Sequence, residues 1–132
     1  MLILDLNGPQ ETFRIDERIK CYARLEQEVV NAKLFENFIC IEMDANTKVG
    51  NEIIKLDPNS RSSNGTLLAE LCEINNLIIC NATKLCQGVI TRQRDTVNGR
   101  ENSVIDYLML CEKNVLIPVF HENRRSTCIC TF

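Results

Sequence analysis

The sequence predicts a mixed α/β layered domain. In the first half of the chain, short apolar segments alternate with a helical pattern, as in strand–helix–strand units. In the second half, strand-like segments follow one another without helices between them, which argues against an all-parallel sheet. No internal repeat, low-complexity stretch or linker divides the 132 residues, a length that suits one domain with a hydrophobic core.

The first two elements are expected to be a strand and a long helix. Leu2–Leu6 is a short apolar strand, which Asn7-Gly8-Pro9 ends because these residues favour a turn. Residues 16–35 form an amphipathic helix, with acidic residues at its start and Lys33 near its end, as the helix dipole prefers. Its apolar stripe recurs in steps of three and four: Ile15, Ile19, Tyr22, Leu25, Val29 and Ala32.

A second strand–helix–strand unit follows. Phe38–Glu42 is an apolar strand, and the polar segment after it is a loop up to Ser63. Ser63 or Asn64 caps a helix that continues to Ile74. Leu77–Cys80 then forms the third strand.

The last segments indicate strands. Val89–Arg94 and Val104–Cys111 flank Asn98-Gly99, which predicts a β-hairpin with a long, loose turn. Val115–Phe120 is a further strand, confined to a sheet edge by Pro118.

Charge and composition restrict the classes of function. A net charge of −3 and a pI of about 5.2 argue against sequence-independent DNA binding through a broad basic surface. They remain compatible with an enzyme whose metal ion joins an acidic site to a phosphate. No apolar run is long enough to cross a membrane, and the first ten residues lack the basic region of a signal peptide. We therefore expect an intracellular protein of the nucleus or cytoplasm.

The eight cysteines do not indicate a zinc site. They include no Cys-x-x-Cys pair, and His121 is the only histidine. Cys40, Cys72, Cys80 and Cys111 each lie inside an apolar run. We expect them to be reduced thiols that pack as small hydrophobic groups, without a disulfide framework.

The segment Phe38–Gly50 carries the most chemical information. Its apolar run ends in Asp44-Ala45-Asn46, so a carboxylate and an amide can project together from the carboxyl end of a strand. A carboxylate can orient or deprotonate a water, and an amide can donate to a phosphate oxygen, which suits phosphodiester chemistry. On spacing alone, an ordinary turn stabilised by Asp and Asn is the more frequent explanation.

Four segments, in order, carry a family likeness. Each segment is similar to one motif of the same family. Asn7-Gly8-Pro9-Gln10-Glu11 is similar to a turn at the end of a strand in that family, and residues 43–50 are similar to a strand that ends in Asp-x-Asn. Residues 63–81 are similar to the helix and strand that follow, and residues 103–107 to a late strand with the sequence Ile-Asp-Tyr. Together they resemble the endonuclease/exonuclease/phosphatase superfamily, and most closely the endonuclease domains of non-LTR retrotransposons. The resemblance spans roughly Leu4 to His121.

The resemblance implies a four-layer α/β sandwich of the deoxyribonuclease-I-like type, of which this chain holds the middle and C-terminal part. It implies a phosphodiesterase that cuts DNA with Mg²⁺ or Mn²⁺. Asp44 would orient or deprotonate the attacking water, Asn46 would hold the scissile phosphate, and Asp106 would support a catalytic histidine. An ordinary solvent-facing position on an alternating strand is the other interpretation of Asp106.

The same resemblance places Thr91, Arg92 and Arg94 where related proteins approach the nucleic acid, and guanidinium groups suit phosphate oxygens. A solvated hairpin strand explains these three residues equally well. The resemblance further implies a reverse transcriptase domain as a partner in full-length relatives.

The chain also departs from the family pattern. Residues 1–132 are expected to be a partial domain, without the opening strands that carry an Asn and the metal-binding Glu and without the closing Ser-Asp-His. Asn7 stands where the family usually has a Tyr, and His121-Glu122-Asn123 lacks the Ser-Asp that precedes the family's histidine. The metal ligands therefore stay unassigned. We expect weak or no cleavage, with a catalytically dead remnant that binds nucleic acid or protein as the alternative.

Overall fold

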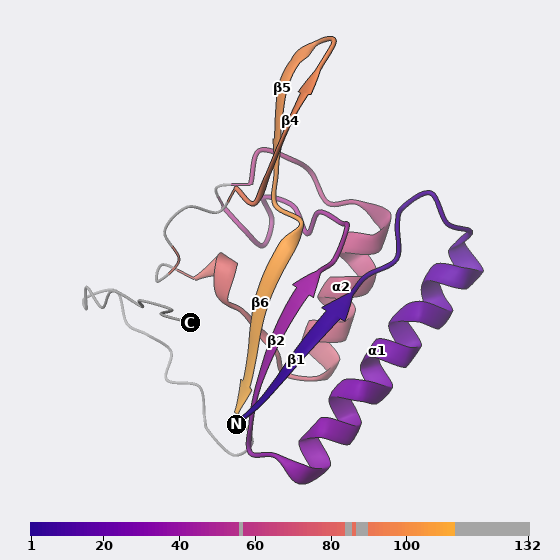
Figure 1. Cartoon of the computed structure of the whole chain (residues 1–132), viewed down its shortest axis with the longest axis vertical. Coiled ribbons are helices and arrows are strands. Elements are labelled where there is room, and N and C mark those ends of the chain that lie inside the picture. Colours follow the sequence, from indigo (N-terminus) through magenta and orange to yellow (C-terminus); the bar gives the residue numbers. More distant parts are fainter. Residues whose placement is uncertain (56, 84–85, 87–89, 113–132) are drawn as a thin grey trace.

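The computed structural model of the chain describes residues 1–55, 57–83, 86 and 90–112 (Figure 1). Its main sheet has four strands in the spatial order β1-β2-β6-β3. Strands β1 and β2 are parallel, whereas β6 runs antiparallel to both of its neighbours. The strands are β1 (Leu2–Asn7), β2 (Phe38–Asp44), β3 (Ile78–Ile79) and β6 (Asp106–Glu112).

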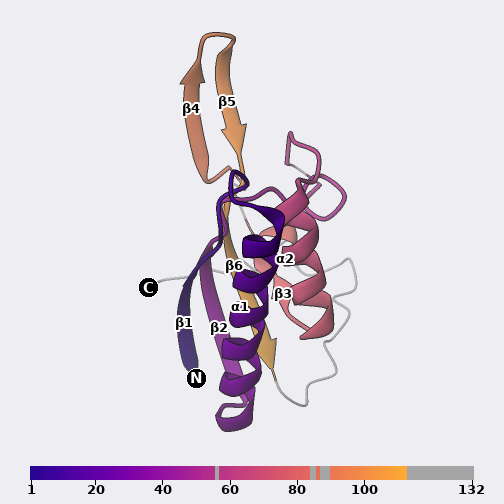
Figure 2. The ribbon, with the colours of Figure 1, turned by 90° about the vertical axis from the view of Figure 1, so that its right-hand side faces the viewer.

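Two helices, α1 (Ile15–Phe35) and α2 (Ser63–Ile74), cover one face of this sheet (Figure 2). Side chains alternate between the faces along a strand, so the buried Ile39, Ile41 and Met43 of β2 face the helices. The residues between them, ending with the exposed Asp44, face the other side. The described residues thus form two layers, one of helices and one of sheet.

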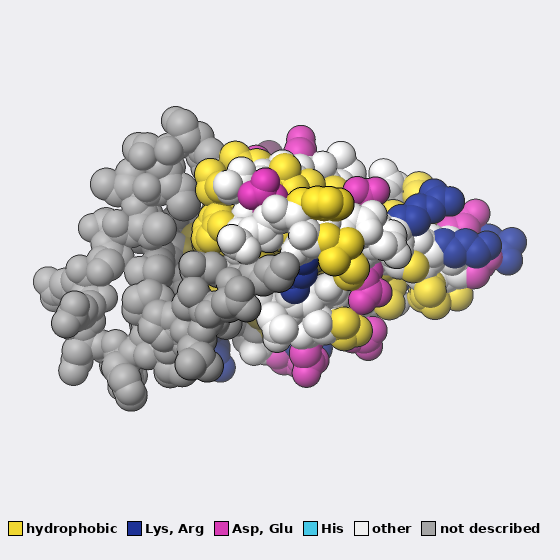
Figure 3. Space-filling view, turned by 90° about the horizontal axis from the view of Figure 1, so that it is seen from below, with side chains coloured by type: hydrophobic (Ala, Val, Ile, Leu, Met, Phe, Trp, Pro, Cys, Tyr) yellow, Lys and Arg dark blue, Asp and Glu magenta, His cyan; other side chains and the backbone are white. Residues whose placement is uncertain are grey.

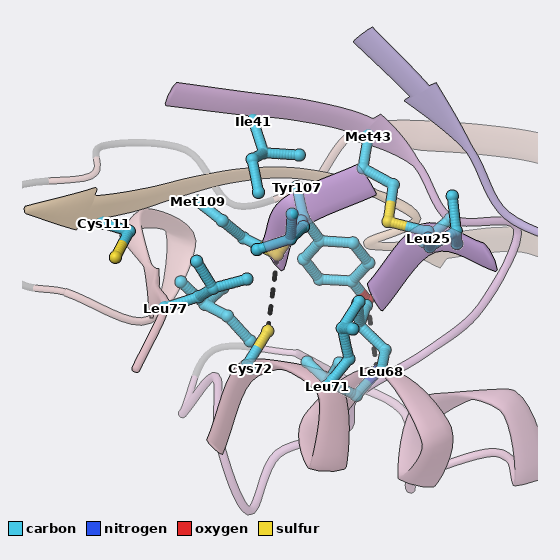
Figure 4. Close-up of a cluster of buried hydrophobic side chains, with 14 of the residues drawn as sticks. Leu25, Ile41, Met43, Leu68, Leu71, Cys72, Leu77, Tyr107, Met109 and Cys111 are labelled. Atoms are coloured by element: carbon cyan, nitrogen blue, oxygen red, sulfur yellow. Dashed lines mark hydrogen bonds between the residues drawn. The ribbon is translucent and has the colours of Figure 1, made fainter. Parts of the chain in front are cut away.

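The core lies between the sheet and the helices (Figure 4). Val29 of α1, Leu68 of α2, Ile41 of β2 and Met109 of β6 are completely buried within it. The Cys72 thiol lies 3.4 Å from the Met109 sulfur, and burial raises the pKa of Cys72 to about 12, which keeps the thiol neutral.

The predicted state of the cysteines is largely confirmed. Cys40, Cys72 and Cys111 are buried and Cys80 is half-buried, and none of the described cysteines forms a disulfide. They contribute to packing as small apolar side chains.

The predicted apolar stripe of α1 is confirmed only in part. Tyr22, Leu25, Val29 and Ala32 are buried as predicted, but Ile15 and Ile19 are about half exposed. The period of the stripe is right, yet the first turns of α1 lie away from the sheet (Figure 1), so Ile15 and Ile19 are only partly covered.

The predicted hairpin has different strands. Asn98-Gly99 does lie at a turn, but the arms are β4 (Arg92–Thr96) and β5 (Gly99–Ser103), which form a separate two-stranded sheet. The apolar segment that was expected to form the second arm enters the main sheet as β6 instead. The reason is composition: β4 and β5 are polar, and β4 and the start of β5 are exposed, whereas β6 alternates and is buried on its helix-facing side.

Smaller differences concern α2 and β3. The cap of α2 is Ser62, one residue before the predicted candidates, and its hydroxyl accepts from the Gly65 N–H at 3.1 Å. The third strand shortens to β3, because the chain turns into a 3₁₀ helix, η1 (Cys80–Ala82). Val89, the predicted strand Val115–Phe120 and His121 lie outside the described residues.

One end of the molecule exposes hydrophobic side chains. The start of β1 and the ends of α1 and α2 bear exposed apolar groups, and the view from below shows hydrophobic side chains on this face (Figure 3). The exposed apolar residues at these element ends include Met1, Leu34, Phe35 and Ile74. Within the described part of the chain, no helix has the length and apolar character needed to span a membrane.

Candidate functional site

Polar side chains form a row across the helix-free face of the sheet. Asn7 of β1 is paired with Asp44 of β2, and Asp44 is paired with Asp106 of β6. All three side chains are exposed. The row lies where β1 and β2 end and β6 begins, because β6 runs in the opposite direction. The two predicted catalytic carboxylates, far apart in sequence, are therefore direct neighbours.

An open hollow of about 660 Å³ lies over Asp44 and Asp106 of this row. Its lining includes four carboxylates, those of Asp5, Glu42, Asp44 and Asp106. Like charges directly opposite each other on paired strands destabilise a sheet by about 0.2–1 kcal/mol per pair. The pairing of Asp44 with Asp106 therefore does not serve stability, and it gives the face the character of a site for water or a cation.

The carboxylates of this face do not make a metal centre by themselves. Among residues 1–55, 57–83, 86 and 90–112, no group of three or more His, Cys, Asp or Glu side chains could hold a metal ion. Mg²⁺ commonly takes one or two carboxylates and completes its shell with waters and phosphate oxygens. The described residues thus offer at most part of such a ligand set.

The loop after β2 is a turn closed by the Asp44 side chain. The Asn46 backbone N–H donates to Asp44 Oδ1 at 3.2 Å, and Asn46 has a positive φ of 47°. The Asn46 amide donates to the Gly8 carbonyl at 3.3 Å, and the Gly8 N–H donates to the Asp44 carbonyl at 2.8 Å. The ordinary-turn interpretation is therefore correct for the backbone, and the turn fixes both side chains.

Asp44 and Asn46 face different hollows. Asp44 borders the acidic hollow with Asp106, whereas Asn46 lines a second hollow of about 190 Å³ with Arg92 and Arg94. Consecutive residues border the two hollows, Thr91 and Asp106 the acidic one and Arg92 and Ile105 the other. These residues lie at the foot of the β4–β5 hairpin, which projects from the domain (Figures 1 and 2). The predicted nucleic-acid residues Arg92 and Arg94 thus lie beside one of the predicted catalytic residues.

Thr91, also predicted to approach nucleic acid, supports the start of β6. Its Oγ1 accepts from the backbone N–H groups of Ile105, at 3.0 Å, and Asp106, at 3.2 Å. The Asn81 side chain donates to the Asp106 carbonyl at 3.1 Å and accepts from the Leu108 N–H at 3.0 Å. Two side chains from outside the sheet therefore hold the Asp106 backbone.

The position of the Asp44–Asn46 loop depends on Tyr107, which the sequence did not single out as a site residue. The buried Tyr107 hydroxyl accepts from the Val49 N–H at 3.1 Å and lies 3.0 Å from the Thr47 carbonyl and 2.9 Å from the Val104 carbonyl. Burial raises the pKa of Tyr107, so the phenol stays protonated and can donate.

Tyr107→Phe is expected to lower the free energy of unfolding by about 1–3 kcal/mol, because the Val49 N–H loses its buried partner. Urea denaturation would measure the change. Tyr22→Phe is the matched control, since the buried Tyr22 hydroxyl has no hydrogen-bond partner among the described residues. That variant should be neutral or slightly more stable, and equal losses in both would contradict a role for the Tyr107 hydrogen bonds.

Glu11 is a second positioning residue that sequence patterns did not indicate. One of its carboxylate oxygens accepts from the Thr47 hydroxyl at 3.2 Å and the Asn64 N–H at 2.9 Å. The other pairs with Arg18 at 3.0 Å. The carboxylate joins the turn after β1, the site loop and the first turn of α2, where a negative charge suits the helix dipole. These contacts span up to 53 residues, so no local signal could reveal them.

Comparison with known proteins supports the fold. No protein-family model matches the chain, and no curated protein matches it. Among solved structures, the endonuclease domain of TRAS1, a telomere-specific non-LTR retrotransposon, matches with a TM-score of 0.52 and 17% identity. The match covers 81% of this chain and 42% of that one.

The chain has the fold of that endonuclease domain in part. The predicted mixed α/β fold of an endonuclease domain is therefore confirmed for part of that fold: the described residues form one layer of helices and one of sheet, and the match spans less than half of the length of this structural neighbour.

Proposed function

We propose that this chain is the part of a retrotransposon-type DNA endonuclease that carries Asp44, Asn46 and Asp106. The observation that supports the proposal most is the direct pairing of Asp44 with Asp106 on an exposed sheet face. That pairing costs stability, and it lies beside a hollow lined by cations. An acidic group for water and basic groups for phosphate are the two requirements of phosphodiester cleavage.

Each residue has a distinct role in this proposal. Asp44 orients or deprotonates the attacking water, and the Asn46 amide donates to the scissile phosphate. Asp106 supports a histidine, which would come from outside the described residues. Mg²⁺ or Mn²⁺ would neutralise charge on the phosphate, with Asp44 and Asp106 as the available carboxylates and further ligands from phosphate oxygens.

The test is nicking of supercoiled plasmid by the purified chain with Mg²⁺ or Mn²⁺. We expect weak nicking that EDTA abolishes, because the described residues supply only part of a ligand set. Nicking that persists in EDTA would contradict a metal-dependent reaction. If nicking is absent in every metal, the chain alone lacks the proposed activity.

A nucleic-acid-binding module without cleavage is the second candidate. The observation in its favour is the exposed strand β4 of the hairpin, which bears Arg92 and Arg94. DNA binding that weakens with salt, measured in EDTA and without nicking in Mg²⁺, would favour this function over the first.

A further inference from the structure

The hollow beside Asn46 is built from charged side chains of two separate segments. Lys48 comes from the loop after β2, while Arg92, Arg94 and Glu101 come from the β4–β5 hairpin. Three cations and one carboxylate leave a net charge of two positive units around about 190 Å³ of space. Such a site favours an anion of small size.

The Glu101 carboxylate forms ion pairs with two of these cations. Its Oε1 lies 3.1 Å from Lys48 Nζ, and its Oε2 lies 3.0 Å from Arg94 Nη2. The Lys48 ammonium and then the Arg94 guanidinium hold the pKa of Glu101 below its usual range, so the carboxylate is ionised at neutral pH. Arg92 has no ion pair or hydrogen bond of its side chain among the described residues.

The shape of the hollow does not depend on Glu101 alone. The Asn59 side chain donates to the Asn102 carbonyl at 3.0 Å and accepts from Lys48 Nζ at 3.2 Å. Asp57 in turn fixes Asn59 through two contacts of about 3 Å. The foot of the hairpin therefore stays attached to the site loop when the Glu101 charge is removed.

We propose that this hollow is a phosphate-binding subsite and that Glu101 is its internal competitor. In the free protein, Glu101 neutralises Lys48 and Arg94. When a nucleic acid binds, a backbone phosphate next to the one held by Asn46 takes these two cations, and Glu101 is displaced. The nature of the ligand rests on the proposed function, whereas the competition between Glu101 and an anion follows from the geometry of the hollow.

Glu101→Gln tests the proposal, because it keeps the size of the side chain and removes the competing charge. Binding of a fluorescein-labelled DNA duplex is measured by anisotropy in EDTA, so that cleavage plays no part. We expect the variant to bind about three- to tenfold more tightly at low salt. Its log–log salt dependence should be steeper by about one unit, since in the wild type the displaced Glu101 carboxylate takes up a cation from solution, which offsets one cation released from the DNA.

Asp95→Asn is the matched control. Asp95 lies on the same hairpin, and its substitution removes the same charge as Glu101→Gln. Its Oδ1 lies 3.2 Å from Arg100 Nε, so the variant breaks an ion pair of Arg100, which does not line the hollow. We expect binding within about twofold of the wild type. Equal tightening in both variants would show an effect of net charge alone and would overturn the subsite, as would unchanged or weaker binding by Glu101→Gln.

Inorganic phosphate provides a second readout. It should compete with the duplex at lower concentration for Glu101→Gln than for Asp95→Asn, whereas equal competition would contradict the subsite. Circular dichroism of both variants checks the fold. A chain that fails to nick plasmid can still show this difference in binding, so failure of the proposed cleavage and failure of the subsite are distinguishable.

Discussion

Asp44→Ala is expected to reduce metal-dependent nicking at least about 10²-fold, the lower end of what a positioned acid or base contributes. The carboxylate is exposed, opposes Asp106 and borders the acidic hollow. The alanine variant also loses the acceptor for the Asn46 N–H, so it disturbs the turn as well as the charge. Plasmid nicking rates in Mg²⁺, beside the wild type, measure the loss.

Asp44→Asn separates these two effects. The amide oxygen can still accept from the Asn46 N–H, whereas the charge is gone. We expect this variant to lose nicking as Asp44→Ala does, yet to be about 0.2–1 kcal/mol more stable, because the repulsion with Asp106 disappears. Asp5 is another carboxylate of the same hollow, and the nicking rate of Asp5→Ala should be within about threefold of the wild-type rate. Full nicking activity of Asp44→Asn would show that Asp44 only stabilises the turn and has no catalytic role.

Gly65→Ala is expected to destabilise the fold by at least about 2–3 kcal/mol, in the range of severe overpacking. Helix propensity alone predicts the opposite sign, since Gly65 lies within α2 and alanine is favoured there by about 1 kcal/mol. However, a Cβ at this position would lie 1.9 Å from the Lys48 carbonyl oxygen. The first turn of α2 and the site loop touch through backbone atoms, so neither can move without the other.

Urea denaturation measures this loss, with Glu70→Ala as the control. Glu70 is exposed on the same helix, and its replacement should change stability by less than about 0.5 kcal/mol. A stable Gly65→Ala variant would mean that the loop can retreat from α2. In that case the position of Lys48 and of the neighbouring hollow would be less fixed than the contacts indicate.

The elements that sequence patterns predicted well are those with strong local periodicity. The apolar runs of β1 and β2 and the buried residues Tyr22, Leu25 and Val29 of α1 follow directly from such patterns. The neighbours of β6 in the sheet do not follow from such patterns. The alternation of β6 predicts a strand, but it does not indicate that β2 and β3 flank it. The polar β4 and β5 show no alternation, so the sequence predicts the turn at Asn98-Gly99 and the first residues of β4 within Val89–Arg94, but not β5.

The residues of the candidate site likewise fall into those that the sequence predicts and those that it does not. Asp44 and Asp106 were singled out from their sequence context, and the structure brings them together on paired strands. Thr91, Asn81 and Tyr107 act through backbone groups that are distant in sequence, and Lys48 and Glu101 meet across 53 residues. Such contacts are properties of the assembled fold, and a single sequence carries no local signal for them.

The place of β6 in the sheet has a consequence for how the protein is made. This strand is the last one described along the chain, yet it lies between β2 and β3. A nascent polypeptide that has emerged only as far as the hairpin leaves one edge of β2 and the short β3 without a neighbour. The main sheet can therefore close only after residue 112 has been synthesised. Until then, unpaired edges and apolar surface invite capture by chaperones.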